Sequence, residues 1–182
     1  MQGHIIRLSL SVIIGFLVNF VWGQVVTSVP LFPSDLSSVT ITFDATKGTG
    51  GLAGFSGEIY AHTGVITNQS ASSTDWKYVK TNWGENTTET QLNKVDENKY
   101  ELEIGPSIRA YYGVPADEEI LKIALVFRSA DASLEGKDDG GEDLFIELNN
   151  GFVLRIVNVS SRYKLYQEND SIDLEFITSE RA

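Results

Sequence analysis

VTITF at Val39–Phe43 alternates apolar side chains with threonine, and the prediction of fold class starts from this alternation. Because successive side chains of a β-strand point to opposite faces, the segment is expected to bury its apolar face and expose its threonines. YELEI at Tyr100–Ile104 repeats the pattern with glutamate in place of threonine. The longer apolar run Ile120–Phe127, interrupted by Lys122, indicates a central strand that is covered on both faces.

Further short strands are expected at Leu144–Leu148, Phe152–Val157 and Ile172–Ile177. The segments between strands contain turn residues, as in Asp138–Gly141, and Gly105–Pro115 has room for one helical turn that ends before its last proline. Many short strands with Gly, Asn and Asp between them and almost no helix are typical of an antiparallel sandwich. We therefore predict an all-β, antiparallel, immunoglobulin-like β-sandwich.

The N-terminal residues have the three parts of a secretory signal peptide. Arg7 gives a weakly basic start, Leu8–Val21 is a largely apolar run, and the small residue Gly23 precedes Gln24. The apolar run is shorter than the stretch of about 20 residues that a membrane anchor requires. A signal peptide at residues 1–23 is therefore favoured over an N-terminal anchor, and no stable membrane insertion is expected.

The chain of 182 residues has a formal net charge of -11 at pH 7 and no cysteine. An acidic chain repels phosphate backbones, which argues against nucleic-acid binding. An exported chain without cysteine cannot be a disulfide-stapled secreted domain and is more typical of a bacterium. We expect a bacterial protein that is secreted or held at the cell surface, with a core stabilised by apolar burial alone.

Two domains are predicted, with their boundary near Asn150. Residues 24–149 contain enough strands for one sandwich. Residues 150–182 contain only two predicted strands, which cannot bury a core of their own. These strands either complete the first sheet or begin a second immunoglobulin-like domain that the chain cuts off, and the second interpretation is favoured.

Groups that carry catalysis are sparse. His62 is the one histidine that follows the predicted signal peptide, no cysteine exists, and no Gly-x-Ser-x-Gly turn is present. We therefore expect this chain to have no enzymatic activity and to need no cofactor.

One acidic turn offers a metal-binding alternative. It contains Asp138, Asp139, Glu142 and Asp143, whose carboxylates are the oxygen ligands that Ca²⁺ prefers. The spacing differs from that of an EF-hand, and a solvated turn between strands explains the same residues. Calcium binding and a plain turn both stay open.

Three large aromatic residues, Trp76, Tyr78 and Trp83, fall within a segment rich in Asn, Thr and Ser. Because an exposed indole is costly, a tryptophan in such a segment needs a core pocket or a ligand. Sugar rings offer C–H faces to aromatic planes and hydroxyl groups to polar neighbours such as His62 and Lys80. In an extended segment, alternation would put Trp76, Tyr78 and Lys80 on one face. Burial of the tryptophans in the core is the alternative.

Several motifs, in this order, carry a resemblance to a known family. They are IYAHTGVIT at Ile59–Thr67, WKYV followed by Trp83–Gly84, GPSIR followed by Tyr112–Pro115, LVFRSAD at Leu125–Asp131, and GGEDLF at Gly140–Phe145. They resemble the N-terminal, starch-binding-like β-sandwich module of secreted bacterial α-amylase-type glycoside hydrolases. The resemblance covers about residues 24–149.

This resemblance implies a function for the module and a place for the activity. The partner would be a polysaccharide, an α-glucan of the starch type, bound without catalysis. The catalytic domain of the hydrolase would lie beyond Ala182. A structural immunoglobulin-like spacer or interaction domain without sugar affinity is the alternative, since fold alone does not imply function.

The resemblance also implies a set of ligand-binding residues. Trp76 and Trp83 would form the aromatic platform, and the other site residues would be Tyr60, His62, Tyr78, Lys80, Arg128 and Asp131. The sequence departs from the family pattern in the loop after Arg128. Ala130 stands where a small or Asn-like residue is usual, and Leu134 lies near the position of a tryptophan that often follows.

Overall fold

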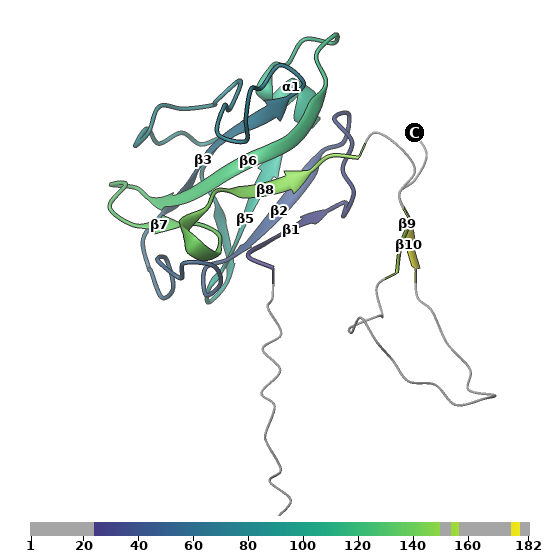
Figure 1. Cartoon of the computed structure of the whole chain (residues 1–182). Helices are drawn as coiled ribbons and strands as arrows, with labels where there is room; N and C mark the ends of the chain where they lie inside the picture. The colour runs from purple at the N-terminus through teal and green to yellow at the C-terminus, as the bar shows by residue number, and fades with distance from the viewer. Residues whose placement is uncertain (1–23, 150–153, 157–175, 179–182) are drawn as a thin grey trace, which may run out of the picture.

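The computed structural model describes residues 24–149 and two short strands, β9 (Leu154–Ile156) and β10 (Phe176–Thr178) (Figure 1). β9 and β10 pair antiparallel in a two-stranded sheet of their own, and residues 172–175 of the predicted strand at Ile172–Ile177 lie outside the described residues. The predicted signal peptide at residues 1–23 lies outside the described residues, as does most of the predicted second domain at residues 150–182.

The first sheet has four antiparallel strands in the order β1-β2-β5-β4. Their bounds are Val26–Val29 for β1, Val39–Asp44 for β2, Asn93–Asp96 for β4 and Lys99–Ile104 for β5. Along β2 the apolar side chains are buried and the alternate side chains are half-buried. The threonines on that outer face donate hydrogen bonds to glutamates of β5, as Thr40 does to Glu103 at 3.0 Å. The predicted strands at β2 and β5 are confirmed.

The second sheet is built on β6 (Ile120–Ser129), which pairs along one edge with β3 (Ile59–Thr67). Two short strands, β7 (Glu135–Gly136) and β8 (Leu144–Glu147), pair with its other edge. Nearly every residue of β6 is buried. The prediction of a central strand with both faces covered is therefore confirmed.

A short helix, α1 (Ile108–Tyr112), occupies the segment where one helical turn was predicted. The Ser107 side chain caps its N-terminus, and Gly113, with a φ of 72°, ends it in the left-handed conformation that glycine adopts without strain. A hydrogen bond of 2.7 Å between the hydroxyls of Tyr112 and Thr63 ties α1 to β3. Within the part of the chain that the structure describes, no helix is long and apolar enough to cross a bilayer.

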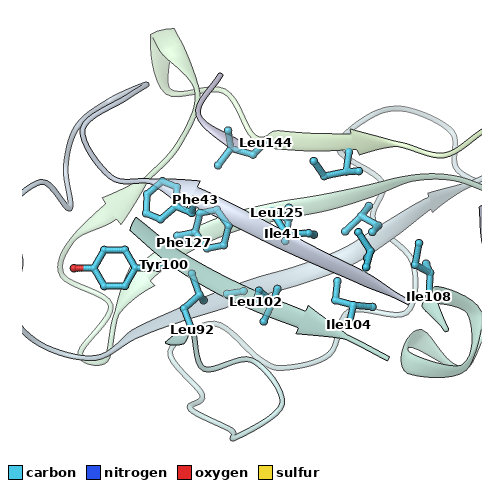
Figure 2. Close-up of a cluster of buried hydrophobic side chains, with 14 of the residues drawn as sticks. Ile41, Phe43, Leu92, Tyr100, Leu102, Ile104, Ile108, Leu125, Phe127 and Leu144 are labelled. Atoms are coloured by element: carbon cyan, nitrogen blue, oxygen red, sulfur yellow. The ribbon is translucent and has the colours of Figure 1, made fainter. Parts of the chain in front are cut away.

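The two sheets pack face to face, with the hydrophobic core between them (Figures 1 and 2). Phe43 of β2 stacks on Phe127 of β6 with the ring centroids 4.2 Å apart, so this contact joins the two layers directly. The other labelled side chains of Figure 2 are Ile41, Leu92, Tyr100, Leu102, Ile104, Ile108, Leu125 and Leu144. Burying one large apolar side chain contributes about 1.5–3 kcal/mol. Residues 24–149 thus form an antiparallel β-sandwich, as predicted, whereas the immunoglobulin-like detail stays a prediction.

Four strands, β1, β3, β4 and β7, were not predicted. In β3 all residues except His62 are buried, because one face covers the core and the other carries the segment that follows the strand. A strand covered on both faces has no polar alternation to show in its sequence. In β4 every residue is exposed, so its sequence shows no apolar face either.

Replacing Phe127 by alanine is expected to lower the free energy of unfolding by about 3–5 kcal/mol, because it removes a buried ring and leaves a cavity. Val95→Ala is a suitable control, since Val95 is 51% exposed and its truncation should change stability by no more than about 0.5 kcal/mol. Urea unfolding followed by circular dichroism measures both values. Equal midpoints for the two variants would contradict this account of the core.

Candidate functional site

A groove of about 470 Å³ crosses the outer face of the β3–β6 pair, on the side opposite the core. Its floor is formed by His62 and Val126, which face each other across the two strands. The aromatic wall, made of Trp76, Val79 and Trp83, comes from the loop between β3 and β4. The charged wall, made of Glu135, Lys137 and Asp143, comes from β7 and the approach to β8. The lining residues are His62, Thr74, Asp75, Trp76, Val79, Trp83, Val126, Glu135, Lys137 and Asp143.

The aromatic wall is held against β3 by backbone contacts. Lys77 and Val65 exchange two hydrogen bonds, with the Val65 N–H donating at 2.9 Å and the Lys77 N–H donating at 2.8 Å. Gly64 permits this close approach, because a Cβ there would lie 2.9 Å from the Lys77 carbonyl oxygen and 3.1 Å from a methyl group of Val79. The absence of a side chain at Gly64 therefore lets the loop bring Trp76 and Val79 to the groove.

Both indoles of the aromatic wall pack against His62. The Trp76 ring lies 5.7 Å from the imidazole at an interplanar angle of 25°, and the Trp83 ring lies 5.2 Å from it at 78°. Since one indole is nearly parallel to the imidazole and the other nearly perpendicular, the two indole planes are strongly tilted relative to each other. Trp83 remains 48% exposed, and Trp76 is partly buried.

Arg128 is fully buried, although its guanidinium is charged, and this group lies near the Trp83 ring. It donates a hydrogen bond of 2.8 Å to the Asn86 side-chain oxygen and another to the Glu85 carbonyl oxygen. Its guanidinium carbon lies 6.0 Å from the Trp83 ring centroid and 5.6 Å from that of Tyr60. Among the described residues it forms no ion pair with a carboxylate. Arg128 thus anchors the loop that carries Trp83.

The charged wall shares one ammonium group between two carboxylates. The Lys137 Nζ lies 3.3 Å from an oxygen of Asp143 and 4.0 Å from an oxygen of Glu135. The Lys137 carbonyl accepts a hydrogen bond of 3.0 Å from the Thr49 N–H, in a glycine-rich loop. A Cβ on Gly48 would lie 2.0 Å from that carbonyl oxygen, so only glycine fits there. Sequence reasoning missed Glu135 and Lys137, because isolated charges near a turn give no signal until the fold brings them together.

The predicted platform residues Trp76, Trp83 and His62 do meet in one groove, but the predicted common face of Trp76, Tyr78 and Lys80 is wrong. Tyr78 has a φ of 51°, in the left-handed region, so the backbone is not extended and strict alternation fails. Tyr78 packs against the core instead. The Lys80 Nζ donates to the carbonyl oxygen of Tyr111 at 2.9 Å, away from the groove lining.

Three other predicted site residues, Tyr60, Arg128 and Asp131, do not line the groove. Tyr60 is buried and donates its hydroxyl to Glu58 at 2.9 Å. Hydrogen bonds from the side chains of Ser129 and Ser133 lower the pKa of Asp131 to about 2. The Asp131 carboxylate is therefore committed to its own turn, and Arg128 contacts the groove only through Trp83.

The acidic turn proposed for calcium has its own internal contacts. The side chain of Asp138 accepts a hydrogen bond of 2.9 Å from the Asp139 N–H, and Asp143 pairs with Lys137. Across residues 24–149 no group of three or more His, Cys, Asp or Glu side chains gathers in a way that could hold a metal ion. Calcium binding by Asp138, Asp139, Glu142 and Asp143 stays a prediction.

Comparison with known proteins gives the chain a family. Residues 26–135 match the model of a domain of unknown function, DUF8578. The chain belongs to this family. The DUF8578 match includes the floor and the aromatic wall of the groove and ends within β7, at Glu135. No curated protein matches the chain. The resemblance to starch-binding modules stays a prediction.

Burial and the nearby positive charge of Arg128 lower the pKa of His62 below its ordinary value of 6.5, and the negative charge of Asp143 opposes them. The Nδ1 atom of His62 is buried and has no hydrogen-bond partner among the described residues. The imidazole is therefore held in its neutral form, packed between two indoles.

We expect the imidazole of His62 to titrate with a midpoint below 6.5 in an NMR pH titration. The folded state binds this proton more weakly than the unfolded state. The contribution of His62 to the free energy of unfolding is therefore fully present above pH 6.5. It is lost as the pH falls from there through the folded-state pKa. His62→Gln should remove this part of the pH dependence and identify the signal. A midpoint at or above the ordinary value would contradict the described packing.

Arg128→Met should leave Glu85 and Asn86 without their donor and loosen the loop that carries Trp83. The expected result is stronger acrylamide quenching of tryptophan fluorescence at a pH and temperature where the fold is intact. Lys94→Met is the matched control, since the Lys94 ammonium also lies over a ring, that of Tyr100, but is exposed. Equal quenching in both variants would show that Arg128 does not anchor the loop.

Proposed function

We propose that the DUF8578 domain of this chain is a non-catalytic carbohydrate-binding module and that its ligand is a starch-like α-glucan. The proposal depends on one observation: two indoles line a single open groove, and one of them is 48% exposed. The alternative, in which both tryptophans are buried in the core, does not hold for Trp83, because its side chain is exposed in the groove. An exposed indole held in a fixed orientation is a feature that a ligand explains.

The chemistry of the groove suits a sugar. The C–H face of a hexose can pack on an indole, and its hydroxyl groups can reach the carboxylates and the ammonium group of the charged wall. The lining combines apolar side chains, such as those of Trp83 and Val126, with charged ones, which matches the two-sided character of a sugar ring.

The tilt between the indoles supports a curved glucan over a flat one. A flat, ribbon-like polysaccharide would stack best on aromatic rings that lie in one plane. Trp76 and Trp83 make very different angles with His62, so successive sugar units stacked on them must change direction. The helical course of an α-glucan supplies this change, in agreement with the resemblance to starch-binding modules.

The setting of this module belongs to the same proposal. The signal-peptide-like start and the resemblance support an exported bacterial protein in which the module holds a glycoside hydrolase on its polymer. Catalysis would belong to a domain beyond Ala182. Within the described residues, the groove offers one histidine and three carboxylates, and the histidine is packed between two rings.

A structural spacer without sugar affinity is the second candidate. It is favoured by the contacts of Tyr60, Tyr78, Lys80, Arg128 and Asp131, which are all engaged within the fold. A spacer predicts that soluble maltooligosaccharides leave the tryptophan fluorescence of the chain unchanged. The binding module predicts a shift of this emission on titration with maltoheptaose.

Affinity electrophoresis of the purified chain in gels that contain amylose tests the proposal. Retarded migration is expected, and Trp83→Ala and Trp76→Ala should each weaken binding about tenfold or more, as loss of an anchoring aromatic does. Val95→Ala, which changes an exposed residue of β4 outside the groove lining, should bind like the unchanged chain. Unretarded migration of the unchanged chain, equal to that of the tryptophan variants, would refute the binding module.

A further inference from the structure

The charged wall has hydrogen-bonding capacity that the fold does not use. Among the described residues, the side chains of Glu135, Lys137 and Asp143 make no hydrogen bond. The Lys137 Nζ lies 3.3 Å from the nearest Asp143 oxygen and 4.0 Å from the nearest Glu135 oxygen. A charge-assisted hydrogen bond between nitrogen and oxygen is usually about 2.7–2.9 Å long. The donor atom of Lys137 and the acceptor atoms of the two carboxylates therefore lie near one another in the groove without forming a hydrogen bond.

Two other charged side chains near the groove are already engaged in hydrogen bonds. Asp75 accepts hydrogen bonds from the Ala71 N–H and the Lys77 ammonium, both at 2.9 Å. The Arg128 guanidinium donates its hydrogen bonds to Glu85 and Asn86, in the loop that carries Trp83. The charged wall thus differs from the rest of the groove rim in having charged atoms free to bind a ligand.

The backbone that carries this wall is nevertheless fixed. The Lys137 carbonyl accepts from the Thr49 N–H at 3.0 Å, and the Lys137 N–H donates to the Thr49 hydroxyl at 3.2 Å. Gly136, between Glu135 and Lys137, faces the ring of Phe43, and a Cβ there would lie 2.5 Å from that ring. A held backbone with uncommitted side-chain atoms is the arrangement of a preorganised binding site.

We propose that Lys137 and Asp143 form the specificity-determining pair of the groove and bind two adjacent hydroxyl groups of a neutral sugar. This inference rests on the proposed function, since it assumes a sugar seated on the aromatic wall. The Lys137 ammonium donates to one hydroxyl oxygen, and the Asp143 carboxylate accepts from the neighbouring hydroxyl. A vicinal diol presents the matching acceptor and donor on adjacent carbon atoms, and in an α-1,4-glucan the 2- and 3-hydroxyls form such a diol.

The position of the pair relative to the aromatic wall follows from the strand order. β7 and β8 lie along one edge of β6, while β3 and the loop with the tryptophans lie along the other. A sugar lying on an indole therefore turns its hydroxyl-bearing edge toward Lys137 and Asp143. The aromatic wall supplies affinity for any sugar face, and the charged wall distinguishes sugars by the hydroxyls they carry.

Calorimetric binding of β-cyclodextrin, a cyclic α-1,4-glucan, to the purified chain tests the pair. Lys137→Met and Asp143→Asn should each weaken binding about tenfold or more, as the loss of a hydrogen bond to a charged group does. The 2,3-di-O-methyl derivative of β-cyclodextrin has no free vicinal diol. The unchanged chain should bind it more weakly, and the two substitutions should have little further effect on it.

Lys94→Met serves as the surface-charge control, because Lys94 is exposed on β4, outside the groove lining. It should bind both ligands like the unchanged chain, and thermal melting confirms that every variant is folded. If the tryptophan variants lose β-cyclodextrin while folded Lys137→Met and Asp143→Asn retain it, the pair is refuted and the binding module stands. If the unchanged chain binds neither cyclodextrin nor amylose, the binding module itself is refuted.

Discussion

The register between β3 and β6 is the constraint on which both the core and the groove depend. It sets Ala61 opposite Phe127 on the buried face and His62 opposite Val126 on the outer face. Because side chains alternate along a strand, a slip of one residue would exchange the two faces. The same pairing that stacks Phe127 on Phe43 therefore also forms the floor of the groove.

The two walls of the groove depend on that floor in different ways. The aromatic wall is attached by backbone hydrogen bonds to the edge of β3 and is supported from behind by Arg128, a buried cation. Burial of a charge without a paired carboxylate is costly, so the contacts of Arg128 with the loop carbonyl and amide oxygens must offset the desolvation. The charged wall is supported by a glycine-rich loop and keeps its side chains uncommitted. The aromatic wall is largely apolar and is attached to β3 through its backbone, whereas the charged wall is attached to the glycine-rich loop through its backbone and, among the residues that the structure describes, leaves its charged side chains without hydrogen bonds.

The sequence predicted the parts of this structure that have a local signal. β2, β5 and β6 were recognisable because alternation or a long apolar run follows directly from their burial. Trp76 and Trp83 were recognisable because an exposed aromatic side chain in a polar segment is costly without a partner, and His62 was included as a polar neighbour of them. The predicted position of Tyr78 on the same face as Trp76 was wrong, because the neighbouring residues do not indicate that its backbone is left-handed. Glu135 and Lys137 were missed, and Asp143 was predicted only as a calcium ligand, because these residues meet the aromatic wall only through the order of strands.

The hydrogen atom that Gly64 carries in place of a side chain controls the width of the groove from a position that does not line it. A methyl group there would have to push the carbonyl of Lys77 outward and would carry the neighbouring indole with it. Relatives that differ at this single position would present the same aromatic residues at another separation. A substitution at this one position would thus change the separation of the two walls while every residue that lines the groove stays unchanged.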